Sequence, residues 1–309
     1  MTTMRAVTYD HFGDDSTLAV TEQPLPRVAP GEVLVRVRAA GVNPVDWKVM
    51  SGGLDQLMET QFPAVPGWDV AGVVERVGID VPDYAVGDEV IGYARKDWVH
   101  GGTFAEFVAV PVRCLAHKPS ALSWQQAAGL PLAGLTAYQV LHRLGLAEGK
   151  TVLIHAGAGG VGSAGVQVAV AAGARVIATA SEANHEYLRG LGAEPVTYGD
   201  GLAERVRALA PDGVDIVADF VGGVLEATLA VLADGGVHAS IADPAVLEAG
   251  GQWMWVHPNA ADLAALAELA QSGAVKVEVA ASFGLDDVPA AFALSREGHT
   301  RGKIVIEVS

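Results

Sequence analysis

Apolar and polar positions alternate in several short stretches of the first ~115 residues. Val33–Val42 reads VLVRVRAAGV, in which apolar residues alternate with arginines, a pattern typical of a half-buried strand. Proline–glycine pairs such as Pro30-Gly31 and Pro66-Gly67 separate these stretches. Many short strands without intervening helices predict a barrel-like β domain. Further strands are expected at Asp69–Gly78, Glu89–Tyr93 and Phe104–Val110.

The spacing of apolar residues changes near Pro119, where helical patterns begin. Ser123, followed three residues later by Gln126, predicts the start of a helix. From Thr151 on, strands and helices alternate, which predicts parallel strands joined by crossover helices in a doubly wound sheet. Expected strands are Thr151–His155, Arg175–Thr179, Val214–Phe220 and Val237–Ile241, and expected helices are Gly160–Ala172, Asn184–Leu191, Leu202–Ala210, Leu225–Leu232 and Ala260–Ser272.

A β pattern returns near the C-terminus, at Val275–Ala281 and Lys303–Val308. In the simplest assembly these strands rejoin the first domain. We therefore assign residues 1–118 and 272–309 to the β domain and residues 119–271 to the α/β domain, a fold of the α/β class. Val237–Ile241 is expected at the edge of the parallel sheet, where the sheets of two subunits could join.

The charge of the chain narrows the range of partners. Its 309 residues carry 20 Lys and Arg against 36 Asp and Glu, a net charge of −16. Because the sequence has no basic cluster, neither nucleic acid nor an anionic membrane surface is an expected partner. The single cysteine, Cys114, excludes an intrachain disulfide and a four-cysteine zinc site. With no signal-peptide pattern and no apolar span, we expect a protein of the reduced cytoplasm.

The stretch Thr151–Ala169, TVLIHAGAGGVGSAGVQVA, places a glycine-rich turn between a strand and a helix. Its first glycine permits a tight turn, the second lets the backbone approach a diphosphate, and the third lets the helix pack close to the sheet. The N–H groups and dipole at the helix start favour phosphate groups. A tight turn with no ligand is the alternative. The expected cofactor contacts are Gly157, Gly159, Gly160, Val161 and Gly162.

The end of the next strand bears on which dinucleotide binds. Sites for NAD usually carry an acidic residue there, whereas this chain has Ala180-Ser181. Ser181 leaves room for a 2′-phosphate, which favours NADPH over NADH. Glu182 just beyond it, and the lack of a basic residue before Arg189, oppose this prediction. Because ligands bind outside the carboxyl ends of parallel strands, the residues expected beneath the nicotinamide are Val221, Ser240 and Ile241.

Six phrases, in their order along the chain, resemble the medium-chain dehydrogenase/reductase superfamily, and most closely its zinc-independent quinone oxidoreductase branch. They are GVNPVDWKVMSG, PGWDVAGVVERVG, GTFAEFV, AAGLPLAGLTAY, HAGAGGVG and GKIVI. The resemblance spans essentially the whole chain. It implies a GroES-like β domain, a Rossmann domain, NADPH-dependent hydride transfer and a homodimer.

The chain departs from the zinc-dependent members of this family. Those members carry a cysteine where this chain has Asn43, and a His-Glu pair where it has Trp68-Asp69. Asparagine and tryptophan do not replace such ligands, so no catalytic zinc is expected. A site without a metal suits an electron-poor substrate, a quinone or an alkene conjugated to a carbonyl. Hydrogen-bond donors must then hold the oxygen on which charge develops.

The resemblance also suggests individual roles. Asn43 follows a strand and is expected to open a loop. By the resemblance, Asn43 would lie near the nicotinamide ribose and the substrate carbonyl, and Lys48 would face the cofactor cleft expected between the two domains. These two residues are the catalytic candidates. A turn before Pro44 and an exposed lysine are the respective alternatives. Thr136 would meet the nicotinamide end of the cofactor, unless it is a buried threonine bonded to a backbone carbonyl. Tyr198 would border the 2′-phosphate.

Four aromatic residues are expected in loops that border the cleft, where they could form a flat apolar wall for the substrate. A dimer contact or core packing is the alternative for them. His155 and Cys114 are expected to be packed residues without a chemical role. The four aromatic residues are Tyr93, Trp98, Trp253 and Trp255.

These observations predict a two-domain, zinc-independent NADPH oxidoreductase whose small-molecule substrate is a quinone or an α,β-unsaturated carbonyl. An enoyl reductase of secondary metabolism uses the same chemistry and is one alternative. A non-enzymatic sensor that binds NADPH is another. Turnover of NADPH with a panel of quinones and enones distinguishes the enzymes from the sensor.

Overall fold

The computed structural model describes residues 2–308, which form two compact units. Unit 1 comprises the residues up to Leu132, Pro258–Gly273 and the residues from Val277 onward. Unit 2 comprises Ala133–His257 and Ala274–Lys276. None of the helices in the described part of the chain has the length and apolar character needed to cross a bilayer.

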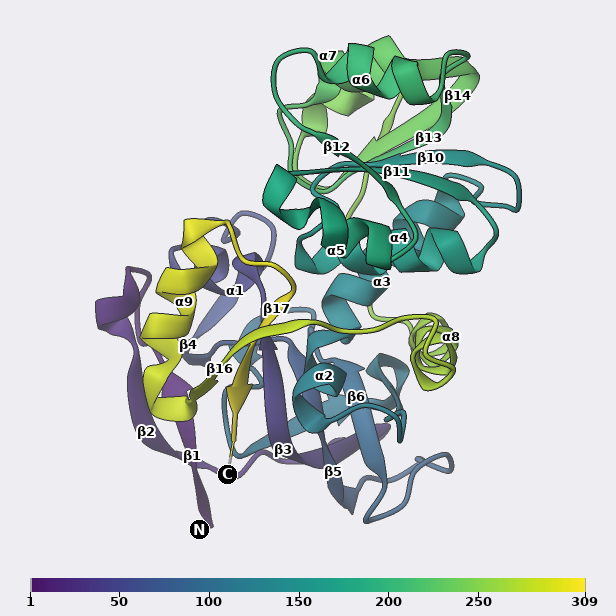
Figure 1. Cartoon of the computed structure of the whole chain (residues 1–309). Coiled ribbons are helices and arrows are strands. Elements are labelled where there is room, and N and C mark those ends of the chain that lie inside the picture. Colours follow the sequence, from purple (N-terminus) through teal and green to yellow (C-terminus); the bar gives the residue numbers. More distant parts are fainter. Residues whose placement is uncertain (1, 309) are drawn as a thin grey trace. The chain divides into compact units, whose positions relative to one another are not determined.

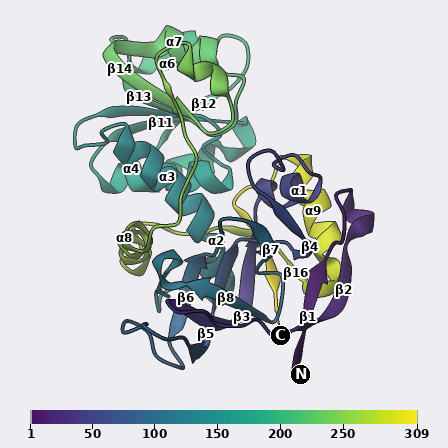
Figure 2. The same cartoon turned by 180° about the vertical axis from the view of Figure 1, so that it is seen from behind.

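Unit 1 is built around a seven-stranded sheet (Figures 1 and 2). In its longest strand, β3 (Glu32–Val42), the valines before Ala39 are buried and Arg36 and Arg38 are exposed, as the alternation predicted. Of the C-terminal strands, β17 pairs with β3 and β16 pairs with β17, so both continue the sheet of the N-terminal region. The strand order is β16 (Val279–Gly284), β17 (Lys303–Glu307), β3, β5 (Asp69–Val77), β6 (Glu89–Tyr93) and β9 (Leu115–His117), with β8 (Phe107–Pro111) also paired to β3.

Short strand pairs and helices complete unit 1. β1 (Thr3–Thr8) pairs with β2 (Ala19–Pro24), and β4 (Thr60–Val65) pairs with β7 (Val99–Gly101). Ser123 and Gln126 form the predicted capping box at the start of α2. The helices are α1 (Pro44–Met50), α2 (Trp124–Gly129), α8 (Ala260–Gln271) and α9 (Val288–Glu297), with the 3₁₀ turns η1 (Asp15–Thr17), η2 (Val112–Cys114) and η5 (Leu285–Asp287).

The two units divide the chain at other positions than those expected from the sequence. α2 packs against β3 and β5, and α8 packs against β9, so both helices belong to unit 1. The change to helical spacing near Pro119 predicts both in the α/β domain of residues 119–271, and that prediction differs from the structure. Helix α3 (Pro131–Arg143) begins in unit 1 and continues in unit 2.

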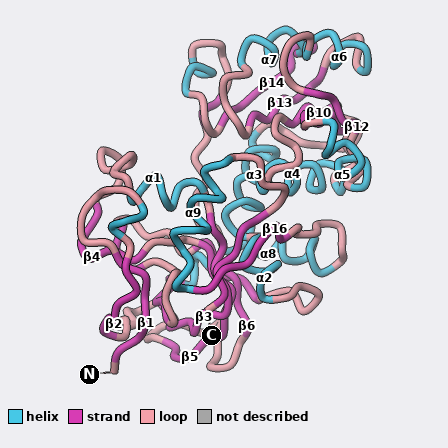
Figure 3. Tube along the Cα trace, turned by 60° about the vertical axis from the view of Figure 1, so that its left-hand side comes forward, coloured by secondary structure: helices cyan, strands magenta, loops and turns pink. Residues whose placement is uncertain are grey.

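Unit 2 contains the predicted doubly wound sheet, whose strands are all parallel. α4 (Gly160–Ala171) and α5 (His185–Gly190) cover one face, and α6 (Leu202–Leu209) and α7 (Leu225–Val231) cover the other (Figures 1 and 3). Aliphatic side chains of the strands and of α6 and α7 form a buried core. The strand order is β12 (Glu194–Thr197), β11 (Arg175–Ala180), β10 (Thr151–Ile154), β13 (Val214–Asp219), β14 (Leu232–Ser240) and β15 (Gln252–Trp253), with the 3₁₀ turns η3 (Glu182–Asn184) and η4 (Pro244–Leu247).

Several expectations about local structure are wrong. The segment after Asn43 is the helix α1 and not a loop, because Pro44 fits the first helical position, where its missing N–H is not needed. Val237–Ile241 is not at the sheet edge, because β15 pairs with the end of β14. Tyr93 and Trp253 lie in the strands β6 and β15 and not in loops. α9 was not predicted, and β8 and β16 begin later than expected.

Candidate active site

The glycine turn of unit 2 connects β10 to α4 at the carboxyl edge of the parallel sheet. Gly157 N donates to Thr179 O at 2.8 Å, and Ala156 N donates to Thr179 Oγ1 at 3.0 Å. The left-handed backbone of the turn falls on Ala156, with φ of 56°, and not on a glycine. Strand β11 therefore fixes the conformation of the turn.

The three glycines of the motif differ in the space around them. A Cβ added to Gly157 would lie 2.8 Å from Ala178 Cβ, and a Cβ added to Gly162 would lie 2.1 Å from Ala156 O. A Cβ added to Gly159 would have Ala156 O, at 3.4 Å, as its nearest neighbour. Gly162 thus allows α4 to pack against the turn, whereas Gly159 could hold a Cβ without a clash.

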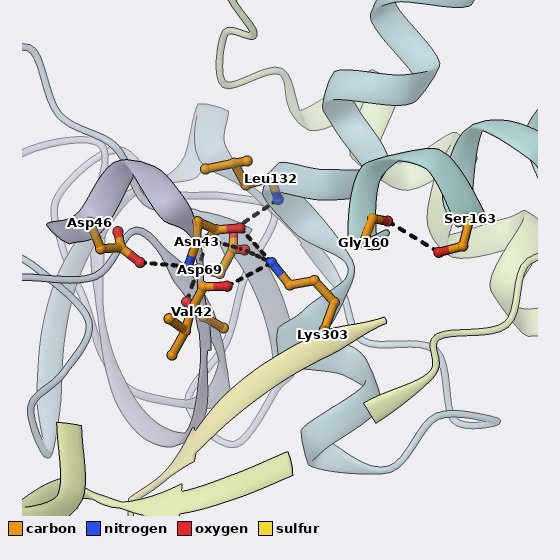
Figure 4. Close-up of polar contacts among 9 residues, drawn as sticks. Val42, Asn43, Asp46, Asp69, Leu132, Gly160, Ser163 and Lys303 are labelled. Carbon is orange, nitrogen blue, oxygen red and sulfur yellow. Dashed lines mark hydrogen bonds and ion pairs between the residues drawn. The ribbon is translucent and has the colours of Figure 1, made fainter. Parts of the chain in front are cut away.

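The start of α4 presents backbone N–H groups at this edge. Ser163 N makes the first intrahelical bond, to Gly159 O at 2.9 Å, so Gly160, Val161 and Gly162 precede it. Ser163 Oγ donates to Gly160 O at 3.3 Å (Figure 4). Such a helix N-terminus suits an anionic group, because its first N–H groups have no intrahelical partner and carry the positive end of the helix dipole.

Ser181 and Tyr198 are neighbours at the same edge of the sheet. They directly follow Ala180 and Thr197, which are register partners in the parallel strands β11 and β12. Tyr198 is 55% exposed. Ser181 Oγ accepts a hydrogen bond from Asn184 Nδ2 at 3.2 Å. The fold therefore brings together the two residues expected at the 2′-phosphate, although their contact with a cofactor stays a prediction.

Arg205 on α6 is a basic residue at this edge that the sequence analysis missed. Its guanidinium donates to Thr197 O at 3.0 Å, Tyr198 O at 3.4 Å and Gly199 O at 3.3 Å. Arg189, the nearest cation in sequence after Ser181, pairs instead with Glu186. The sequence feature that could have identified Arg205 is its position, a basic residue in the first turn of the helix that follows β12.

The residues expected near the nicotinamide lie at the ends of β13 and β14, which pair at Asp219 and Ser240. Val221 is 55% exposed, whereas Ser240 is buried and its hydroxyl donates to Asp219 Oδ2 at 2.7 Å. Ile241 follows Ser240 in the chain and is partly buried. Thr136 is buried in α3. Asp219 was not singled out from the sequence.

Unit 1 contains a buried cluster of polar side chains around Asn43 (Figure 4). Asn43 Nδ2 donates to Asp69 Oδ2 at 2.9 Å and lies 3.4 Å from Gly41 O. Asn43 Oδ1 accepts from Lys303 Nζ, which also donates to Val42 O at 3.0 Å. Both ends of the Asn43 amide are therefore bonded within unit 1, and its contact with a substrate or cofactor stays a prediction.

The two aspartates of this cluster each hold the start of a helix. Asp69 Oδ1 accepts from Leu132 N at 2.8 Å at the start of α3. Asp46 Oδ2 accepts from Asn43 N at 2.8 Å at the start of α1 (Figure 4). Backbone N–H groups at a helix start are satisfied by carboxylates in this way. The cluster therefore fixes the strand–helix junction that carries Asn43 and Lys48.

Burial perturbs the ionisation of the cluster. It raises the pKa of Asp46 to about 8. It raises the pKa of Asp69 to about 6, although the Lys303 ammonium acts in the opposite direction. Burial lowers the pKa of Lys303, which the two aspartates counteract. Burial therefore favours the protonated form of Asp46, whereas Asp69 pairs with Lys303 at 3.7 Å between Oδ2 and Nζ.

Lys48 and the aromatic candidates differ in exposure. Lys48 is exposed on α1, and its Nζ lies 5.5 Å from the centroid of the Trp47 ring. Tyr93 is buried at the end of β6 and packs against Trp68 with 6.1 Å between ring centroids. The other aromatic candidates, Trp98, Trp253 and Trp255, are exposed. Their contact with a substrate stays a prediction.

Cys114 and His155 are buried, as expected. Burial raises the pKa of the Cys114 thiol to about 11 and lowers the pKa of His155 to about 4. Neither group is therefore charged near neutral pH. Within residues 2–308, no three His, Cys, Asp or Glu side chains are grouped so that they could hold a metal ion.

Comparison with protein families matches residues 29–120 to the alcohol dehydrogenase GroES-like domain and residues 191–306 to the zinc-binding dehydrogenase family. Two plant proteins are each 36% identical over 98% of this chain and 79% of their own length. They are a 2-methylene-furan-3-one reductase of Solanum lycopersicum and a chloroplastic NADPH-dependent alkenal/one oxidoreductase of Arabidopsis thaliana. A solved structure of the quinone oxidoreductase from Coxiella burnetii is 33% identical, covers 100% of both chains and superposes with a TM-score of 0.87.

Proposed function

Because the chain belongs to the medium-chain dehydrogenase/reductase superfamily, we propose that it is an NADPH-dependent oxidoreductase that transfers a hydride to a quinone or an α,β-unsaturated carbonyl. The alkenal/one and quinone oxidoreductases among its relatives support this substrate class. The structural observation that carries the proposal is the glycine turn, where a Cβ on Gly159 would make no contact closer than 3.4 Å, whereas one on Gly157 or Gly162 would clash.

The carboxyl edge of the sheet in unit 2 offers a group for each part of the cofactor. The N–H groups of Gly160, Val161 and Gly162 would hold the diphosphate. Ser181 and Tyr198 would hold the 2′-phosphate, with Arg205 contributing positive charge nearby. The nicotinamide half would lie over the ends of β13 and β14. When bound, NADPH supplies the hydride.

We propose that the reaction uses no zinc. Zinc-dependent relatives carry ligands where this chain has Asn43 and Trp68-Asp69. The carboxylate of Asp69 accepts hydrogen bonds from Asn43 and Leu132 and pairs with Lys303. The protein itself therefore satisfies the Asp69 carboxylate without a metal ion, which supports the proposal.

Lys48 is the group we propose to stabilise charge on the substrate oxygen. An electron-poor alkene or quinone takes up a hydride at carbon, and negative charge then develops on its oxygen. Lys48 is exposed on α1, whereas the amide of Asn43 is buried and bonded to Asp69 and Lys303. Lys48 is therefore the more accessible donor, while both ends of the Asn43 amide are used within unit 1.

We also propose a cytoplasmic homodimer, with β15 as the contact. β15 is one of the two outer strands of the sheet in unit 2, and Trp253 on it is exposed. Edge strands and exposed aromatic side chains favour association. Light scattering should give twice the mass of one chain, and Trp253→Asp should reduce it to that of a monomer.

Steady-state consumption of NADPH with a panel of quinones and enones tests the proposed activity. We expect turnover with at least one compound, without added metal and in the presence of a chelator. Lys48→Met should lower kcat/KM at least about tenfold, and Lys48→Arg, which keeps a donor, should lower it less. Binding of NADPH without consumption across the panel would contradict the proposed activity and favour a binding protein.

A further inference from the structure

One carboxylate and one hydroxyl tie together the two loops at the ends of β13 and β14. Asp219 Oδ1 accepts from Val221 N and from Gly222 N, each at 2.9 Å. Asp219 Oδ2 accepts from Ser240 Oγ at 2.7 Å. Asp219 and Ser240 are both buried and are register partners on the two strands. The carboxylate thus receives three hydrogen bonds, which compensate for its removal from water.

Ser240 passes this connection on to the second loop. Its hydroxyl accepts from Ala242 N at 3.1 Å and from Asp243 N at 3.0 Å. The backbone adds a bond from Ile241 N to Asp219 O at 3.1 Å. The hydroxyl of Ser240 therefore holds the residues after β14, as Asp219 holds those after β13.

The loops are also in close contact with each other. Gly222 and Gly223 have φ of 84° and 70°, conformations that glycine adopts most readily. A Cβ added to Gly222 would lie 3.2 Å from Ala242 Cβ. Val221 is 55% exposed between the buried Asp219 and these glycines. The pair Asp219–Ser240 thus supports a surface at the carboxyl edge of the sheet on which Val221, Gly223 and Ala242 are exposed.

We infer that Asp219 and Ser240 are positioning residues that hold this surface in shape for the nicotinamide half of the cofactor. The inference rests on the proposed function, because ligands of such sheets bind outside the carboxyl ends of the strands. The hydroxyl of Ser240 bonds to groups of the protein itself. Ser240 would therefore act on the cofactor through the loops that it holds, and not by direct contact. A preformed surface spares the cofactor the cost of ordering two loops.

Binding of two ligands to the purified protein separates this role from a general effect on folding. NADPH carries the nicotinamide half, whereas adenosine 2′,5′-bisphosphate lacks it and reports on the glycine turn, Ser181 and Tyr198. Asp219→Asn should weaken NADPH binding about tenfold and Ser240→Ala about fivefold. Both variants should bind adenosine 2′,5′-bisphosphate within about twofold of the parent protein.

Asp215→Asn is the matched control, because Asp215 lies on the same strand at its opposite end. Its carboxylate accepts from Thr151 N at 2.8 Å and from Lys150 Nζ at 3.0 Å. This substitution should lower the melting temperature and leave the Kd of both ligands unchanged. Ser240→Ala removes a single oxygen atom, so it keeps the test available if Asp219→Asn does not fold.

Weaker binding of NADPH with unchanged binding of adenosine 2′,5′-bisphosphate would support the positioning role of Asp219 and Ser240. Equal weakening of both ligands, or no weakening of either in a folded variant, would overturn it. If the parent protein binds both ligands, such a result leaves the proposed function intact. If the parent protein binds neither, the proposed function fails and this inference fails with it.

Discussion

Lys303 Nζ lies 3.7 Å from Asp69 Oδ2, and both side chains are buried in unit 1. The side chain of Lys303 is 7% exposed and that of Asp69 is 0% exposed. Asn43 lies between them, accepting from Lys303 and donating to Asp69. A buried ion pair of this kind adds little stability over an apolar pair, but loss of one partner leaves a charge in the interior. The structural contribution of the Asp69–Lys303 pair is that it fixes the orientation of the Asn43 amide.

Lys303→Met should destabilise the protein by about 3–5 kcal/mol, because Asp69 would lose its buried cation. Lys118→Met is the matched control, since the side chain of Lys118 is also 7% exposed but its partner Glu89 is 52% exposed. That substitution should cost less than Lys303→Met, because Glu89 stays in contact with water after Lys118 is removed. Urea unfolding of both variants measures the difference. Similar losses for both would show that Asp69 and Lys303 are not the buried pair described.

Asp46→Asn should change how stability depends on pH. Burial raises the pKa of Asp46 to about 8, so the folded protein binds a proton that the unfolded chain releases at a much lower pH. The stability of the parent protein should therefore fall relative to Asp46→Asn by about 1.4 kcal/mol per pH unit as pH rises from 5 to 7, and less steeply from 7 to 8. Denaturant unfolding across this range measures it. A constant difference between the two proteins would mean that Asp46 is ionised throughout.

Gly159→Ala should weaken NADPH binding with little effect on stability, whereas Gly162→Ala should lower stability. Gly159 has φ of −73° and room for a Cβ, so Gly159→Ala should keep the stability within about 1 kcal/mol. Its methyl group would occupy the space left for the diphosphate, and the Kd for NADPH should rise about tenfold or more. In Gly162→Ala the new Cβ meets Ala156 O, which should cost about 1–3 kcal/mol. If Gly159→Ala binds NADPH as tightly as the parent protein, the diphosphate does not bind at this turn.

Ser181→Asp should turn the cofactor preference from NADPH toward NADH. A carboxylate at the end of β11 repels a 2′-phosphate and can accept hydrogen bonds from ribose hydroxyls. We expect KM for NADPH to rise about tenfold and KM for NADH to fall. Glu182→Gln removes the neighbouring acidic residue and should leave NADPH preferred. A clear preference of the parent protein for NADH would contradict the assignment of the cofactor.

Local patterns predicted most of the elements, because the signals lie within each segment. β3 follows from alternation, α2 from Ser123 and Gln126, and the strand–turn–helix from the spacing of its glycines. α1 was missed because Asn43-Pro44 is also typical of a turn, and only the packing of the following residues distinguishes the two.

The polar clusters could not be predicted from local patterns. Lys303 and Asn43 are 260 positions apart and meet because β17 pairs with β3. Asp219 and Ser240 are 21 positions apart and meet through the register of β13 and β14. Sequence periodicity predicts that such strands exist, but not which residues on them become partners.

Transfer of deuterium tests the central claim most directly. NADPH deuterated at nicotinamide C4, on the face that the enzyme uses, would be consumed with an α,β-unsaturated ketone, and the product analysed by mass spectrometry and NMR. We predict one deuterium at the β-carbon of the saturated ketone for each NADPH oxidised. At the same subsaturating NADPH concentration, Gly159→Ala should form this product about tenfold more slowly. Tight binding of NADPH to the parent protein, with no labelled product from any enone and no oxidation of NADPH by any quinone, would contradict the account.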